Sequence, residues 1–213
     1  WNASSACWVS IRIDRPVRFL FSFPDTMLLA LKYYGDPVLR RKGARVDAVT
    51  PEIESLIEDM FETMSEYNGI GLAAQQVGEA VQLTVLDIRA VEDRPSTLEL
   101  DGREADPNSI MPLVLINPKL TPLDDPVAGG EGCLSFPEMY AEITRPESVA
   151  VKALDRDGKS IEFNCGGLLA RAIQHETDHL HGILFIDRMD QATKRDLQEQ
   201  LDELQKKTKA ALP

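Results

Sequence analysis

The chain has 213 residues, 43% of them hydrophobic, which suffices for the core of one domain and argues against global disorder. Its formal net charge of −12 argues against a broad surface for nucleic acid or anionic membranes. Its three cysteines are far apart and do not predict a disulfide framework, and no stretch approaches the roughly 20 apolar residues of a membrane span. We therefore expect neither a specific nucleic acid nor a membrane as partner.

The first methionine is Met27, and residues 1–26 are rich in serine, arginine and aromatic residues without clear periodicity. Such a segment is typical of a transit peptide, translated upstream sequence or a cloning remnant. We expect this leader to lie outside the fold. Residues 27–189 then form one domain, and residues 190–213 form a C-terminal helix.

The first confident element is an amphipathic helix that starts at Thr50-Pro51. It is followed by Gly69–Gly78 (GIGLAAQQVG), a stretch of unusually small residues. Such residues permit close approach of the backbone to a ligand or to a neighbouring element, but they also fit a tight loop packed against the core. Both interpretations stay open on this pattern alone.

The rest of the chain alternates short strands with turns. We expect strands over residues 81–88, 113–116 and 140–144, and a hairpin over 148–154 and 160–163. Asn117-Pro118 should end the second strand, Gly129-Gly130 should lie in a loop, and residues 91–111 should form a polar surface excursion. The fold class is α+β, with short, mostly antiparallel strands around a central helix and an amphipathic C-terminal helix marked by Leu197, Leu201 and Leu204.

The central helix, with Asn164 as its expected N-cap, carries all three histidines of the chain within residues 174–182 (QHETDHLHG). His175 and His179 are four residues apart and therefore share one helix face, so both imidazoles can reach one metal ion. Glu176 would lie beside that ion, where a carboxylate can act on a water molecule. The alternative is a solvated helix face, and His181 is most simply a surface residue.

A catalytic zinc-type site needs a third protein ligand. Phe185 stands where one known continuation of the two-histidine pattern has a third histidine, which excludes that version. A downstream carboxylate, Asp196 or Glu199, would indicate a metallopeptidase. Cys133 is the other candidate, because Gly132 and Ser135 flank it in a turn that can present the sulfur. A structural metal would require a fourth ligand, for which the sequence offers no convincing residue.

Three blocks of the chain together resemble the peptide deformylase family. They are Gly69–Gln76 (GIGLAAQQ), Glu131–Ser135 (EGCLS) and Gln174–Leu180 (QHETDHL), in the order and at the separations usual for that family. The likeness runs from about Tyr34 to Met189. It implies a metal-dependent hydrolase that removes the formyl group from the N-terminal formyl-methionine of newly made polypeptides and releases formate.

The resemblance also implies roles for individual residues. Cys133, His175 and His179 would be the metal ligands, and Glu176 would be the catalytic acid and base. Gln76 and the backbone N–H of Leu134 would bind the formyl oxygen, whereas Ile70 and Gly71 would meet the main chain of the substrate as an added strand.

For the cofactor, the resemblance implies Fe²⁺, with Zn²⁺, Ni²⁺ or Co²⁺ able to occupy the site. The expected partner is the nascent N-formyl-methionyl polypeptide, with transient ribosome contact through the basic end of the last helix. The expected location is a bacterial cytoplasm, with an organelle stroma as the alternative. We further expect Asp178 to pair with Arg145 and so to steady the metal-bearing helix.

Overall fold

The computed structural model describes residues 26–212, so the leader predicted over residues 1–26 lies, except for Thr26, outside the described residues. Within this range no helix is both long and apolar enough to cross a membrane. The elements follow in this order: η1 (Pro37–Arg40), α1 (Pro51–Glu66), β1 (Gly71–Ala73), η2 (Ala74–Val77), β2 (Leu83–Leu86), β3 (Ser96–Leu100), β4 (Arg103–Ala105), η3 (Pro107–Ile110), β5 (Leu113–Pro122), β6 (Pro126–Cys133), β7 (Phe136–Pro146), β8 (Ser148–Leu154), β9 (Ser160–Gly166), α2 (Gly167–Leu180), η4 (Phe185–Asp187), α3 (Gln191–Asp196) and α4 (Gln198–Ala211).

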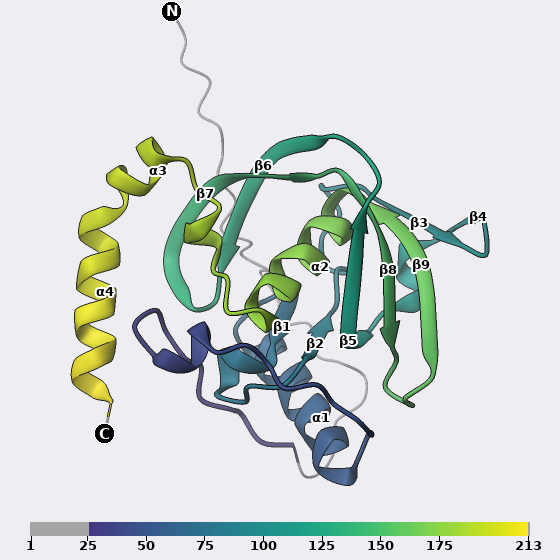
Figure 1. The fold of residues 1–213 in the computed structure, drawn as a ribbon, viewed down its shortest axis with the longest axis horizontal. Coiled ribbons are helices and arrows are strands. Elements are labelled where there is room, and N and C mark those ends of the chain that lie inside the picture. The colour runs from purple at the N-terminus through teal and green to yellow at the C-terminus, as the bar shows by residue number, and fades with distance from the viewer. Residues whose placement is uncertain (1–25, 213) are drawn as a thin grey trace, which may run out of the picture.

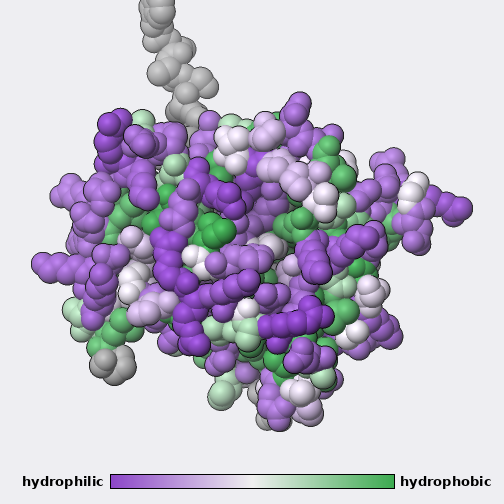
Figure 2. Space-filling view, viewed as in Figure 1, coloured by the Kyte–Doolittle hydropathy of each residue, from purple (hydrophilic) through white to green (hydrophobic). Residues whose placement is uncertain are grey.

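The helix α2 occupies the centre of the molecule, between two antiparallel sheets (Figure 1). The larger sheet has the strand order β1-β2-β5-β8-β9-β3-β4, and the smaller one is the long hairpin β6–β7. The apolar side chains of α2 pack against the larger sheet, while α1 packs against β1, β2 and β5. This arrangement confirms the predicted α+β class with its central helix. On the face in Figure 2, hydrophilic residues cover most of the surface and apolar residues form separate patches.

The strand β5 is longer than predicted. Asn117 does not end it, because a register shift between Ile116 and Lys119 accommodates this residue and pairing with β8 then continues to Pro122. Asn117 has a positive φ of 53°, and its side-chain amide bonds both the N–H and the carbonyl of Val46 at 3.0 and 2.7 Å. The turn residues therefore form a bulge within the strand.

The predicted loop at Gly129-Gly130 is wrong, since both residues lie within β6. Glycine is a poor strand former, but here the close packing of another residue explains its use. A Cβ built on Gly129 would lie 2.9 Å from the guanidinium of Arg171, which crosses this strand from α2. Gly129 therefore makes room for the buried Arg171.

The prediction for residues 91–111 is also wrong in part. The segment contains β3, which extends the larger sheet by pairing with β9, and only Leu98 is fully buried among its residues. At the start of β3, the carbonyl of Pro95 and the hydroxyl of Ser96 accept the N–H groups of Leu168 and Leu169, both at 3.0 Å. These residues satisfy the free N–H groups at the start of α2.

Asn164 is accordingly not the N-cap of the central helix. It lies in β9, paired with β8 and β3, and Gly166 holds the N-cap position. At the other end of the chain, α4 packs through Leu201 against the cluster that contains Phe136 and Phe185. The C-terminal residues thus cover part of the core that lies behind the β6–β7 turn.

Candidate functional site

The helix α2 is buried along almost its whole length, because it passes between the two sheets. His175, Glu176 and His179 are 7%, 5% and 1% exposed, so the solvated helix face considered from the sequence is excluded. The exposed His181 lies just past the helix, as predicted, and its Nδ1 contacts the carbonyl of Thr177 at 2.8 Å.

The candidate metal ligands meet at one point. One ligand atom each of Cys133, His175 and His179 lies within 4.8 Å of the other two, and Cys133 Sγ is 3.3 Å from His179 Nε2. Cys133 reaches the helix because it ends β6, directly before the turn to β7. Among residues 26–212 this group contains no carboxylate and no fourth ligand.

The alternative ligands lie elsewhere. Asp196 and Glu199 are exposed residues of the C-terminal helices. Phe185 is buried, with its ring 4.9 Å from that of Phe136 in an edge-to-face contact. The structure therefore favours Cys133 over a downstream carboxylate.

A buried carboxylate orients the first histidine. Glu131 Oε2 lies 2.9 Å from His175 Nδ1, so this nitrogen carries the proton and Nε2 is left with a lone pair for a metal ion. Burial by itself would raise the pKa of Glu131, but hydrogen bonds from His175 and Arg145 outweigh it and lower the pKa to about 2. Glu131 is thus an anion at neutral pH despite its burial.

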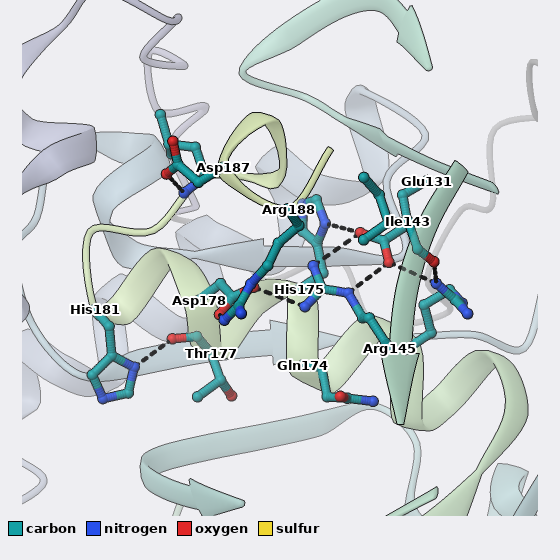
Figure 3. A network of polar contacts seen from close by, with 12 residues as sticks. Glu131, Ile143, Arg145, Gln174, His175, Thr177, Asp178, His181, Asp187 and Arg188 are labelled. Atoms are coloured by element: carbon teal, nitrogen blue, oxygen red, sulfur yellow. Dashed lines mark hydrogen bonds and ion pairs between the residues drawn. The ribbon is translucent and has the colours of Figure 1, made fainter. Parts of the chain in front are cut away.

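Two arginines tie this carboxylate to the rest of the site (Figure 3). Arg145, on β7, bonds Glu131 at 2.6 and 3.0 Å and also donates to Asp178 at 2.7 Å. The predicted pair between Asp178 and Arg145 is confirmed, and Arg188 adds a second partner for Asp178 at 2.7 Å. Arg171 donates to Glu131 at 3.0 Å. Through these contacts the hairpin β6–β7 is fixed to α2.

Gln76 also reaches the metal-ligand group. Its Oε1 accepts the N–H of Ala73 at 2.8 Å, which fixes the orientation of the amide. Its Nε2 then points toward Cys133 Sγ at 3.5 Å and Ser135 Oγ at 3.4 Å. These long contacts leave the amide as a donor directed into the site.

The small residues of the first block are explained by close packing. A Cβ on Gly71 would lie 2.6 Å from Glu176 Oε1, and one on Gly69 would lie 2.8 Å from Leu134 Cδ1. Of the two interpretations given above, close approach to a neighbouring group holds for both glycines. The block therefore brings β1 against Glu176 and against the turn that follows Cys133.

The pKa values of the three functional candidates on α2, His175, Glu176 and His179, shift in different ways. Burial raises the pKa of Glu176 to about 7, and Glu176 Oε2 has no hydrogen-bond partner among the described residues. Burial lowers the pKa of both histidines, but contacts with Cys133 and Glu131 reverse the direction for His175 and raise it. Burial together with the nearby His175 keeps the pKa of His179 well below 6.5.

Sequence reasoning missed the roles of Glu131 and Arg171. Glu131 stood in the second block without a role, although a buried partner for a metal-ligating histidine is a common requirement. Arg171 is four residues before His175 and therefore on the same helix face, which was an available signal. No local pattern indicated the role of Ser96, since it caps a helix that starts 71 residues later.

The side chains fit a metal ion. They offer one sulfur and two imidazole nitrogens, a set that suits zinc or a similar divalent ion and leaves coordination positions open for water and substrate. An ionised carboxylate holds one imidazole, and the carboxylate of Glu176, one of whose oxygens has no hydrogen-bond partner among residues 26–212, lies beside it. The fold and the site together define a metal-dependent hydrolase.

The family model of polypeptide deformylase matches residues 28–195. The chain belongs to the peptide deformylase family, whose members are metal-dependent enzymes that remove the N-formyl group from new polypeptides.

Individual relatives agree with this assignment. The chain is 45% identical to the peptide deformylase of Opitutus terrae over 187 residues, which cover 87% of this chain and 97% of that one. It is 42% identical to that of Methylacidiphilum infernorum over 180 residues, covering 84% and 94% of the two chains. A solved peptide deformylase of Arabidopsis thaliana superposes with a TM-score of 0.72 at 39% identity, with 88% and 96% covered.

Proposed function

We propose that Cys133, His175 and His179 bind one divalent metal ion and that Glu176 is the acid and base of the deformylation reaction. The observation that carries this proposal is the meeting of the three ligand atoms within 4.8 Å, next to a buried carboxylate oxygen without a partner. The proposed catalytic domain spans residues 27–189, and residues 190–213 add the C-terminal helical segment.

The chemistry follows from these positions. A divalent ion would supply Lewis-acid activation of a water molecule and of the formyl oxygen. Glu176 accepts a proton from the attacking water and later donates it to the departing amine, which must leave protonated. A carboxyl group whose pKa is raised to about 7 by burial suits both transfers near neutral pH.

Gln76 and Leu134 bind the formyl oxygen as negative charge develops on it. The bond from Ala73 N–H to Gln76 Oε1 leaves Nε2 as the donor that faces the site, and Leu134 lies in the turn directly after Cys133. Removing one preset donor of this kind typically costs about 3–4 kcal/mol of transition-state stabilisation.

The substrate main chain binds beside Ile70 and Gly71. Within the described chain, β1 pairs only with β2 and β6 pairs only with β7, so each strand has a free edge. Both free strands adjoin the site, since β1 contacts Glu176 and β6 ends at Cys133. An extended peptide that adds to such an edge is held by main-chain hydrogen bonds, which tolerate many sequences.

Formate release from formyl-Met-Ala-Ser tests the assignment. We expect activity in the wild type, loss of activity in Glu176→Ala with metal retained, and loss of both activity and metal in Cys133→Ser. Glu199→Ala is the matched control and should behave as the wild type. An active Glu176→Ala variant would contradict the proposal, and a Glu199→Ala variant that loses its metal would favour the metallopeptidase instead.

We propose Fe²⁺ as the physiological ion, as the family resemblance implies. If this is right, exposure to oxygen should lower activity because both iron and the thiolate of Cys133 are oxidised. Anaerobic reconstitution with Fe²⁺ should then restore more activity than Zn²⁺ does. Equal specific activity of the two metal forms, measured at equal metal content, would refute the choice of iron.

We propose transient contact with the ribosome and a place in the bacterial cytoplasm. The first is supported by exposed Lys206, Lys207 and Lys209 at the end of α4, and the second by the bacterial source of the relatives at 42–45% identity. Replacing the three lysines by glutamate should reduce cosedimentation with ribosomes at low salt without changing formate release from a tripeptide. Unchanged cosedimentation would refute the contact.

A further inference from the structure

The segment that leads from β2 to β3 carries the half-buried cation Arg94. Arg94 is half-buried, yet its side chain forms no hydrogen bond or ion pair with residues 26–212. Such an arginine differs from the two buried arginines of the site, Arg145 and Arg171, each of which bonds a carboxylate. Its environment therefore requires an explanation.

Contacts at both ends hold this segment at the edge of the site. The N–H of Val91 donates to the carbonyl of Ile88 at 3.0 Å, and the carbonyl of Pro95 accepts the N–H of Leu168 at 3.0 Å. Val91 and Ile70 pack against the same hydrophobic cluster, which also contains Leu168. The segment thus runs from Asp87, whose N–H donates to the carbonyl of Ile70 at 3.0 Å, to Pro95 at the first turn of α2, and Arg94 lies one residue before Pro95.

Among the charged groups that the structure describes, none is a dedicated anion for Arg94. Burial and the like charge of Arg171 lower the pKa of Arg94, and the attraction of Asp93 and Glu131 only partly opposes this. Glu131 already accepts hydrogen bonds from Arg145, Arg171 and His175. A negative group that approaches this edge would therefore meet a partly desolvated cation with free donors.

We propose that Arg94 is a specificity-determining residue that binds a carboxylate side chain on the first or second residue after the substrate methionine. The proposal rests on the proposed function, because it assumes an extended peptide beside Ile70 and Gly71. In an extended chain each residue advances about 3.3 Å, so these two positions lie within about 7 Å of the methionine along the edge. Arg94 would also offset, at this edge, the repulsion between an acidic protein and acidic nascent chains.

Steady-state deformylation of four amidated peptides tests this inference. The peptides are formyl-Met-Ala-Ser, formyl-Met-Glu-Ser, formyl-Met-Ala-Glu and formyl-Met-Lys-Ser, and amidation removes the carboxylate of the C-terminus. For each glutamate peptide we take the ratio of its kcat/KM to that for formyl-Met-Ala-Ser. We expect this ratio to be higher in the wild type than in Arg94→Gln for one of the two glutamate peptides. An ion pair at a half-exposed position corresponds to about a 3- to 5-fold change in this kcat/KM ratio.

Charge reversal sharpens the test. Arg94→Glu should lower the ratio for the acidic peptide further and raise it for the lysine peptide. Arg103→Glu on β4 changes the net charge equally and should leave both ratios at their wild-type values. Activity of every variant on formyl-Met-Ala-Ser shows that the variant is folded and performs the deformylase reaction. If the wild type has no activity on this peptide, the proposed function is refuted. Ratios that are equal in the wild type, Arg94→Gln and Arg94→Glu would overturn the role of Arg94 alone.

Discussion

Replacing Glu131 by glutamine removes one charge from the site while keeping the volume of the side chain. In the structure each carboxylate oxygen accepts two hydrogen bonds. Oε1 accepts from Arg145 Nε at 2.6 Å and Arg171 Nη1 at 3.0 Å, and Oε2 accepts from Arg145 Nη2 at 3.0 Å and His175 Nδ1 at 2.9 Å. In either orientation the amide NH₂ of glutamine would face two donors instead of accepting from them.

We expect Glu131→Gln to lower the free energy of unfolding of the metal-free protein by about 3–5 kcal/mol at pH 7, the cost typical of removing one partner from a buried ion pair. Two independent considerations give a loss of unfolding free energy of similar magnitude. Two buried donors without acceptors cost about 1–3 kcal/mol each. A carboxyl whose pKa is lowered from 4.5 to about 2 stabilises the folded state by about 3 kcal/mol when it is ionised.

The pH dependence has a definite sign. Because the folded-state pKa of Glu131 is lowered, its stabilising effect is complete above the unfolded pKa near 4.5 and is lost as the pH falls toward 2. The difference in unfolding free energy between wild type and Glu131→Gln should therefore be largest near neutral pH. It should decrease below pH 4.5 for as long as both proteins remain folded.

Denaturant unfolding of both metal-free proteins at a series of pH values measures this difference. Glu142→Gln, an exposed change on β7, is the matched control and should stay within about 0.5 kcal/mol of the wild type. Metal titration provides a second measurement, since the loss of the partner of His175 should weaken metal affinity about 10- to 100-fold. A stability loss below about 1 kcal/mol at pH 7, together with unchanged metal affinity, would refute the reasoning.

Three further changes test other parts of the site. Glu176→Gln should stabilise the metal-free protein by about 1–3 kcal/mol above pH 8, because a folded-state pKa raised to about 7 makes the ionised carboxylate destabilising there. The gain should vanish below pH 4, where the carboxyl is protonated in both states, and a gain independent of pH would contradict this account. Gly71→Ala should lower kcat by about 100-fold at full metal content, because a Cβ 2.6 Å from Glu176 Oε1 displaces that carboxylate; unchanged kcat would show that β1 can shift without consequence. Ser96→Ala should lower the unfolding free energy by about 1 kcal/mol through loss of the hydrogen bond to Leu169 N–H, and a Tm equal to that of the wild type would exclude the capping role.

The parts of the site that could be predicted from the sequence depend on local spacing. His175 and His179 share a helix face for any chain that is helical there, and Glu176 follows from the same geometry. The pair between Asp178 and Arg145 was predictable because an acid inside a buried helix needs a partner. These inferences required no knowledge of how the sheets are placed.

The parts that escaped prediction depend on contacts between segments far apart in the chain. Gly129 reads as a loop residue, and only the guanidinium of Arg171 across the strand shows why a strand has no side chain there. Asn117 reads as the end of a strand, but its amide pairs with the distant backbone of Val46 and the strand continues. Turn residues indicate a local change of conformation, and the sequence alone does not distinguish a bulge within a strand from the end of that strand.

The buried charges explain how such distant segments form one accurate site. Cys133 lies on the hairpin β6–β7, whereas both histidines lie on α2, so the ligand geometry depends on how the hairpin is placed on the helix. Apolar packing alone would permit small sliding of one on the other, and a hydrophobic replacement of buried ion pairs is often equally stable. Directional hydrogen bonds restrict this freedom, since Arg171 bonds Glu131 together with the carbonyls of Val127 and Ile143 at 2.7–3.0 Å. The network therefore contributes chiefly to the position of Cys133 relative to the histidines. This role explains why the buried charges are present although removing them from water costs free energy.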